Sequence, residues 1–328
     1  MNATTWHEPF AGSAPAALRL LSGRLRPLCD YAGTNAPLAR QLLAVAGMVA
    51  GSRPRVVLSD AGPWGAAWSR LSRSSGSALR VARAVGGWWT PAGYDPRDLR
   101  AMVTAPPLPD PDGAVAQFLW MQAHSPRGLP AWWDGRAWVV GQVGGPWCCR
   151  PLSDERALEL VSRNAARGVA TTLFERLRML AAELDGAEFR GRHATAHRAF
   201  PAGNLDGWVS YLDPPRPDQP TYEVGCTPNL VLDLAQSLSG KGARVLVSGS
   251  TELPIEGWHS VQLGPREWLT CSFVPLWRPP EQLGLFPGIP ATQPPGGVSR
   301  TRPQPGMFTD TSSRQLAAVK LVESTPCP

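Results

Sequence analysis

Lysine is nearly absent from this sequence, because Lys241 and Lys320 are the only two among 328 residues. The formal net charge of +6 is therefore carried by arginine. Arginine suits bidentate contacts with phosphate and guanine, so the charge permits a nucleic-acid partner. A coding bias toward Arg, Ala, Gly and Pro explains the same composition, and the charge alone does not identify a function.

Signals for metal sites, disulfides and membrane insertion are also missing. The six cysteines are Cys29, Cys148, Cys149, Cys226, Cys271 and Cys327. They form no Cys-x-x-Cys pair and no histidine stands at ligand spacing, so we expect reduced thiols and no metal. No run of eighteen apolar residues occurs, and residues 1–8 lack a basic region followed by an apolar stretch. We therefore expect an intracellular protein without a signal peptide or membrane span.

Strand and helix patterns alternate along most of the chain. Residues 4–7 and 55–59 read as strands that are each followed by a turn and a helix, and residues 37–49 read as a helix between them. Later, the patterns predict strands at residues 208–212 and 243–248 on either side of a helix at residues 229–238. A hairpin is expected at residues 258–262 and 267–271. This alternation predicts an α/β fold with a mostly parallel sheet.

The middle of the chain has a different composition. Seven tryptophans fall between residues 86 and 147: Trp88, Trp89, Trp120, Trp132, Trp133, Trp138 and Trp147. We expect a smaller inserted domain with its own core, followed by one long helix at residues 153–184. The expected organisation is a first part of the main domain (1–74), the insert (75–165), a second part of the main domain (166–279) and a disordered tail (280–328).

Two short motifs follow predicted strands. The first strand ends in the loop Glu8, Pro9, Phe10, Ala11, Gly12 and Ser13, and the strand at residues 208–212 ends in Asp213, Pro214 and Pro215. In open α/β sheets, ligands bind beyond the carboxyl ends of the strands, where glycine allows close approach and a carboxylate such as Asp60 can bind ribose hydroxyls. Taken alone, the first loop is equally typical of any tight turn between strand and helix.

Both motifs in this order resemble the Dam-like alpha group of adenine-specific DNA methyltransferases, of the phage and prophage type. The resemblance covers most of residues 4–279. It implies a Rossmann-like sheet that binds S-adenosylmethionine, with residues 75–165 as an inserted target-recognition region. It further implies double-stranded DNA as the partner, a monomer, and a bacterial or phage-infected cytoplasm. Arg127, Arg136 and Arg150 are candidates in the insert for contacts with DNA phosphates or bases.

The resemblance also implies roles for single residues. The cofactor would be held by Glu8, Pro9, Phe10, Ala11, Gly12, Ser13 and Asp60. Asp213 and the backbone carbonyl of Pro214, supported by Pro215, would hydrogen-bond the target amine. These acceptors draw the amine hydrogens out of the base plane and so restore the nucleophilicity of the nitrogen. A flipped base also needs a stacking partner, for which Arg216 and Tyr222 are the candidates.

Three positions depart from the family pattern. Arg216 stands where the family has tyrosine, Gly33-Thr34-Asn35 where it has Gly-Gly-Lys, and Gly191-Arg192-His193 where it has an acidic residue. These departures keep a second hypothesis open, in which the chain is a catalytically degraded methyltransferase that acts as a DNA-binding or phage accessory protein. A third possibility is methylation of the cytosine amine, because Asp-Pro-Pro loops serve both bases.

Overall fold

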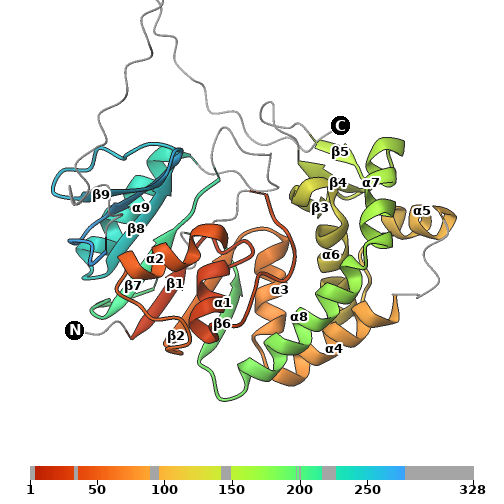
Figure 1. Cartoon of the computed structure of the whole chain (residues 1–328), viewed down its shortest axis with the longest axis horizontal. Helices are drawn as coiled ribbons and strands as arrows, with labels where there is room; N and C mark the ends of the chain where they lie inside the picture. The colour runs from red at the N-terminus through yellow and green to blue at the C-terminus, as the bar shows by residue number, and fades with distance from the viewer. Residues whose placement is uncertain are drawn as a thin grey trace, which may run out of the picture. The chain divides into compact units, whose positions relative to one another are not determined.

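The structure is a computed structural model in which seven parts of the chain are described: residues 4–32, 36–88, 96–141, 149–196, 198, 201–215 and 227–277. All of them belong to one compact unit, residues 1–279. The expected tail, residues 280–328, lies outside the described residues. The fold is α/β, with a seven-stranded, mostly parallel mixed sheet and a separate three-stranded antiparallel sheet (Figure 1).

The large sheet confirms the predicted alternation of strands and helices. Its strands are β1 (Thr5–Glu8), β2 (Arg55–Asp60), β6 (Phe189–His193), β7 (Trp208–Leu212), β8 (Arg244–Gly249), β9 (His259–Gly264) and β10 (Glu267–Cys271). Their order across the sheet is β6-β2-β1-β7-β8-β10-β9. Neighbouring strands are parallel except at β10, which is antiparallel to both β8 and β9. The predicted hairpin is therefore the β9–β10 pair.

The central strands are buried on both faces, and the chain reverses direction around them. All four residues of β1 are buried, as are the middle four residues of β2 and of β8. This is the pattern of parallel strands that are covered by helices on both sides. From β1 the chain proceeds to β2 and β6 on one side, and then returns to β7 on the other. The gap between the carboxyl ends of β1 and β7 is thus the topological switch point of the sheet.

Helices cover the two faces of this sheet. They are α1 (Pro15–Leu21), η1 (Ala36–Leu38), α2 (Ala39–Val45), α3 (Pro63–Leu71) and α9 (Pro228–Gly240). Successive residues of β7 point to opposite faces of the sheet. Tyr211 belongs to the hydrophobic cluster of α1, α2 and α3, whereas Leu212 belongs to the cluster of α9. The two-residue period of a strand thus directs its side chains into two cores.

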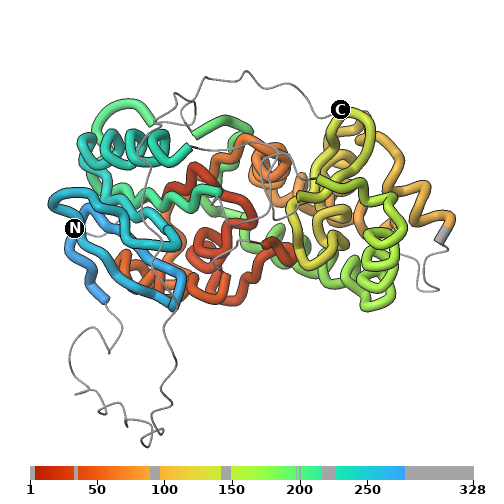
Figure 2. Tube along the Cα trace, turned by 90° about the horizontal axis from the view of Figure 1, so that it is seen from above, coloured from red at the N-terminus to blue at the C-terminus, as the bar shows by residue number. Residues whose placement is uncertain are grey.

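The chain between α3 and β6, which includes the region expected to be an insert (residues 75–165), is mostly helical. Its elements are α4 (Ser75–Gly87), α5 (Pro96–Thr104), α6 (Pro111–His124), η2 (Pro126–Gly128), β3 (Ala131–Trp133), β4 (Trp138–Gly141), β5 (Cys149–Pro151), α7 (Glu155–Ala166) and α8 (Val169–Leu184). Helices α4 and α6 both pack against α8. The three strands form the small antiparallel sheet. Helix α6 packs against α7. Figure 2 shows the chain of this region passing from orange at α4 to yellow and green at the small sheet and α7.

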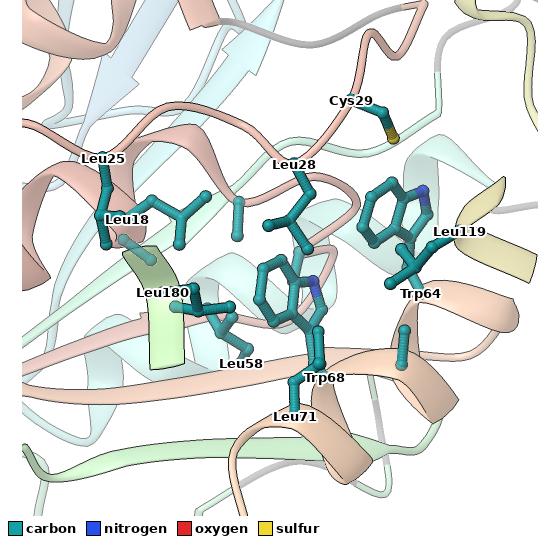
Figure 3. Packing of buried hydrophobic residues seen from close by; sticks show 14 of the residues in the cluster. Leu18, Leu25, Leu28, Cys29, Leu58, Trp64, Trp68, Leu71, Leu119 and Leu180 are labelled. Carbon is teal, nitrogen blue, oxygen red and sulfur yellow. The ribbon is translucent and has the colours of Figure 1, made fainter. Parts of the chain in front are cut away.

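Two expectations for this region are wrong. Residues 153–184 form two helices instead of one, because Gly168 adopts a left-handed conformation at φ 73° and ends the first of them. The insert also lacks a separate core, since Leu119 and Leu180 belong to the same hydrophobic cluster as Trp64 and Trp68 of α3. Figure 3 shows these four side chains close together. The insert is therefore fused to the α3 side of the sheet.

An ionic contact strengthens this junction. Asp112, in the first turn of α6, accepts hydrogen bonds from Nε of Arg70 at 2.5 Å and from Nε of Arg80 at 2.7 Å. Arg70 lies on α3 and Arg80 on α4, so a single carboxylate joins three helices. The side chain of Asp112 is 11% exposed, and these hydrogen bonds lower its pKa to about 2.

Candidate functional site

The two motif loops meet at the switch point of the large sheet. Glu8 is the last residue of β1, and Asp213 directly follows β7, the parallel neighbour of β1. In the register of this pair, His7 lies opposite Ser210. The two carboxyl groups are near enough that the charge of Asp213 contributes to the raised pKa of Glu8. The fold therefore brings the loops at residues 8–13 and 213–215 together from positions 200 residues apart.

Glu8 is an internal anchor of the first loop. Its side chain is buried, and its Oε1 accepts hydrogen bonds from Trp6 Nε1 at 2.6 Å and from the backbone N–H of Ala17 at 3.1 Å. The pKa of Glu8 is raised to about 8, mainly because burial penalises the charged form; the two hydrogen bonds oppose this effect, and the nearby charge of Asp213 adds to it. Glu8 is thus mostly protonated at neutral pH, and it connects β1 to the helix α1 that follows the loop.

The rest of the first loop lies close to the second strand. Pro9, Ala11 and Ser13 are buried, whereas Phe10 is half-buried against the α9 cluster. The backbone N–H of Ala11 donates to the carbonyl oxygen of Ser59 on β2 at 3.0 Å. Gly12 adopts φ +43°, a conformation that favours glycine. The loop is therefore a tight turn that packs against β2 at the carboxyl edge of the sheet.

Asp60 connects the first loop to the turn that follows β2. It is the last residue of β2, where its Oδ2 accepts the backbone N–H of Gly12 at 3.1 Å and its Oδ1 accepts that of Gly62 at 2.8 Å. Burial raises the pKa of Asp60, and the two hydrogen bonds oppose this effect. Both oxygens of the carboxylate expected to bind ribose are therefore bonded to backbone amides of the protein itself.

Aromatic side chains that the sequence reading did not assign to the site surround Gly12. Trp68 Nε1 donates to the carbonyl oxygen of Gly12 at 2.7 Å, and a Cβ on Gly12 would lie 3.0 Å from Cε1 of Tyr31. Tyr31 also makes an edge contact with Trp64, which stacks on Trp68. The one sequence feature that could have assigned these aromatic residues to the site is the position of Trp64 and Trp68 on the helix that follows Asp60. Tyr31, Trp64 and Trp68 form an apolar wall beside Gly12, and Figure 3 shows the two tryptophans next to each other.

The second motif is held by the neighbouring strand. Ser248, near the end of β8, donates its hydroxyl proton to Oδ1 of Asp213. This bond fixes the orientation of the carboxylate at the end of β7. Asp213, Pro214 and Pro215 are all half-buried, so they remain accessible from the carboxyl edge. The two stacking candidates, Arg216 and Tyr222, lie outside the described residues.

The structure gives a reason for one departure from the family pattern. Gly191 lies in β6, where an added Cβ would come within 2.2 Å of the backbone carbonyl carbon of Trp68. Any side chain at this position would therefore push α3 away from the sheet. His193, at the end of β6, donates from Nε2 to the carbonyl oxygen of Ala61 at 2.8 Å. The Gly33-Thr34-Asn35 segment lies outside the described residues.

The arginines expected in the insert differ in their surroundings. Arg150 forms an ion pair with Asp154 at 3.7 Å, and Arg136 is exposed in the turn between β3 and β4. Arg127 is exposed on η2 at the rim of a cavity that involves α7 and α8. His124 is fully buried and stacks on Trp120 with ring centroids 3.9 Å apart, so it belongs to the core.

Neither a metal site nor a membrane span is found among the residues that the structure describes. Across these residues there is no group of three or more His, Cys, Asp or Glu side chains that could hold a metal ion. No helix in the same ranges is long and apolar enough to cross a lipid bilayer. Comparison of the chain with known protein families and with curated proteins finds no match.

Proposed function

We propose that this protein is an S-adenosylmethionine-dependent DNA methyltransferase that modifies the exocyclic amine of adenine. One observation carries the proposal: the loops Glu8–Ser13 and Asp213–Pro215 end adjacent parallel strands at the switch point of the large sheet. Ligands of open α/β sheets bind at this point. The two motifs that resemble the methyltransferase family thus share one candidate site, although they are far apart in the sequence.

The strand order supports the same proposal. When the seven strands of the large sheet are numbered along the chain, their order is 3-2-1-4-5-7-6, and only the seventh is antiparallel to its neighbours. This order places the reversal of chain direction between the first and fourth strands, which are the two strands that end in the motif loops. A nucleotide-binding sheet with the dinucleotide order 3-2-1-4-5-6 has no such inserted antiparallel strand.

The first loop would hold a nucleoside cofactor at the carboxyl end of β1. Gly12 lies at φ +43° close to the ring of Tyr31, and Asp60 holds the loop against β2 through its bond to the Gly12 amide. Phe10 to Ser13 would hold the methionine end of S-adenosylmethionine, and Asp60 would face its ribose. The cofactor supplies a methyl group on a sulfonium, which makes the methyl carbon electrophilic. Glu8, which is buried and mostly protonated, keeps the loop attached to α1 without adding a charge to the site.

The second loop would prepare the amine. An exocyclic amine is a weak nucleophile because its lone pair is delocalised into the base. Asp213 and the carbonyl oxygen of Pro214 would accept hydrogen bonds from the two N–H groups of the amine. These contacts would concentrate the lone pair on the nitrogen as the methyl group is transferred in line. Ser248 is a positioning residue, because its hydrogen bond to Oδ1 fixes the carboxylate that makes this contact.

A second candidate function is DNA binding by a methyltransferase fold that has lost catalysis. It is favoured by the environment of Asp60, whose two oxygens both accept backbone N–H groups instead of facing a ligand. His193 further places an imidazole, not a carboxylate, at the end of the third strand of the sheet. In this case the fold would be retained for its DNA-binding surface alone.

Calorimetric titration of S-adenosylmethionine into the purified protein separates the two candidates. An active enzyme predicts a dissociation constant in the micromolar range, with one site per chain. ATP, which has the adenosine but no sulfonium, serves as the matched ligand and is expected to bind far more weakly. Absence of heat on titration into a protein with a cooperative unfolding transition would support the second candidate. Analysis of the modified base then distinguishes adenine from cytosine.

A further inference from the structure

A cavity of about 410 Å³ lies between the main sheet domain and the insert. It is bounded by the segment after α1, by η2, and by helices α7 and α8. Its polar lining consists mainly of Asp30, Arg127, Asn164, Arg167, Thr172 and Arg176. Three guanidinium groups thus converge from three different elements, with a single carboxylate among them. This charge balance predicts a negatively charged ligand.

The arginines of this cavity differ from most others on these helices. Arg163 on α7 is paired with Glu159, and Arg178 on α8 is paired with Glu175. Neither Arg127 nor Arg167 has a carboxylate within 4 Å in the described part of the chain. Both side chains are exposed at the rim, so their charges remain available to a ligand from solvent.

The base of the cavity is more rigid than its rim. Nη1 of Arg176, which is half-buried, donates to the carbonyl oxygen of Pro27 at 2.8 Å. Asn164 Nδ2 donates to the carbonyl oxygen of His124 at 3.1 Å, which fixes this amide on α7. Helix α8 begins at Val169 on the cavity wall and has no acidic residue in its first turn. Its amino-terminal dipole therefore adds to the positive potential of the arginines.

The cavity is connected to the methyltransferase site through one short segment. The backbone N–H of Ala32 donates to the carbonyl oxygen of Gly128 at 2.7 Å, and Gly128 packs against the backbone of Asp30 and Tyr31. Tyr31 in turn lies over Gly12 of the first loop. Asp30 on the cavity wall is thus the direct chain neighbour of Tyr31 in the aromatic wall of the site.

We propose that this cavity binds a backbone phosphate of the DNA, beside the base that enters the site. The inference rests on the proposed function, since it requires DNA to lie across the carboxyl edge of the sheet. Arginine suits a phosphodiester because its planar group can donate two parallel hydrogen bonds. Arg127 and Arg167 contact the phosphate from the solvent side, and Arg176 contributes charge from below. Such a contact sets the position of the duplex and carries no sequence specificity.

The test is the salt dependence of binding to a 30-base-pair duplex of mixed sequence, measured by fluorescence anisotropy. Each phosphate contact contributes roughly 0.9 to the slope of log K against log salt concentration. The variant Arg127→Gln/Arg167→Gln removes the two solvent-side contacts with this one phosphate, so it is expected to lower the slope by about 0.9 and to weaken binding roughly 8-fold at ~0.1 M salt. The variant Arg127→Lys/Arg167→Lys, which keeps both charges, is expected to retain most of the slope.

The control variant is Arg163→Gln/Arg178→Gln, which makes the same change in net charge on α7 and α8, the two helices that border the cavity. Both of these arginines are exposed and already paired, so an unchanged slope is expected. An equal loss in the control would show that only net charge matters, and would overturn the proposal. An unchanged slope in the cavity variant would also overturn it. Far-ultraviolet circular dichroism confirms that each variant is folded.

Two further outcomes separate this inference from the function on which it rests. If the wild-type protein binds S-adenosylmethionine but the cavity variant binds DNA normally, the phosphate site is refuted and the methyltransferase proposal stands. If inorganic phosphate protects Arg127 and Arg167 from chemical modification as strongly as DNA does at equal phosphate concentration, the ligand is a free phosphate compound and the proposal is wrong. Preferential protection by DNA is the expected result.

Discussion

Replacement of Glu8 by glutamine is expected to change how the stability of the protein depends on pH. Glu8 is 2% exposed, and its pKa rises from an ordinary value of 4.5 to about 8 because burial penalises the charged form. Folding therefore favours the protonated carboxyl. The stability that this group contributes is fully present below pH 4.5 and is lost as the pH rises toward 8. Glutamine is neutral at every pH and has the same shape.

The size of the effect follows from the two pKa values. Between pH 4.5 and about 8 the unfolded chain has released this proton and the folded chain has kept it. Each pH unit in this window lowers the free energy of unfolding by about 1.4 kcal/mol, which amounts to a loss on the order of 5 kcal/mol. The amide oxygen of glutamine can still accept the hydrogen bonds from Trp6 and Ala17. The variant should therefore be close to wild type in acid and more stable above pH 8.

Urea denaturation of both proteins at pH 5, 7 and 9 measures this difference directly. The titration of His7, whose pKa burial lowers to about 4, is common to both proteins and cancels in the comparison. The difference in unfolding free energy is expected to grow steadily with pH in favour of glutamine. A difference that is constant from pH 5 to pH 9 would refute the conclusion that Glu8 is held protonated in the fold.

Two further predictions concern Asp60 and Asp112. Asp60→Ala removes the carboxylate that accepts hydrogen bonds from the Gly12 and Gly62 amides. Calorimetry should show weaker cofactor binding, and fluorescence anisotropy should show little change in DNA binding. Equal losses of cofactor and DNA binding would argue against a place for Asp60 in the cofactor site. Asp112→Ala leaves Arg70 poorly exposed and unpaired, and should lower the free energy of unfolding by about 3 kcal/mol in urea. Glu159→Ala breaks an exposed pair and should change it by less than about 1 kcal/mol, so similar effects of the two changes would contradict the account.

Much of the main sheet could be predicted because its strands carry strong local signals. The runs at residues 55–59 and 243–248 are short, apolar and bounded by turns, and they correspond to β2 and β8. The adjacency of Glu8 and Asp213 could also be anticipated, since both end strands of a parallel sheet. The burial of Glu8 and its hydrogen bond from Trp6 could not be predicted, because both depend on how α1 packs over the end of β1.

The insert was predicted less well because its central helix, α6, lacks a periodic pattern. Helix α6 buries twelve of its fourteen residues, so it has no polar face and no amphipathic repeat. The alternation of apolar and polar residues therefore could not reveal it. The shared core also could not be predicted, because Leu119 and Leu180 contact the α3 side of the sheet only through tertiary packing.

The site shows the same limit. The loop at residues 8–13 and Asp213 were identified from short motifs, whereas Tyr31 and Trp68 were not, because their role depends on how α3 and the segment after α1 pack around Gly12. Gly191 is similar: its sequence context suggested a lost acidic residue, and the structure shows a close approach of α3 to β6 instead. Such steric requirements arise from the packing of one helix or strand against another, so they cannot be recognised from the local sequence.

Transfer of tritiated methyl groups from S-adenosylmethionine to genomic DNA that lacks adenine methylation tests the central claim most directly. The wild-type protein should label the DNA, and the label should be recovered as N6-methyladenine after digestion. Asp213→Ala should reduce the rate at least ~1000-fold, because the contact it removes acts in the transition state, while its unfolding transition remains cooperative. Absence of label with the wild type, or equal labelling by the Asp213→Ala variant, would contradict the account.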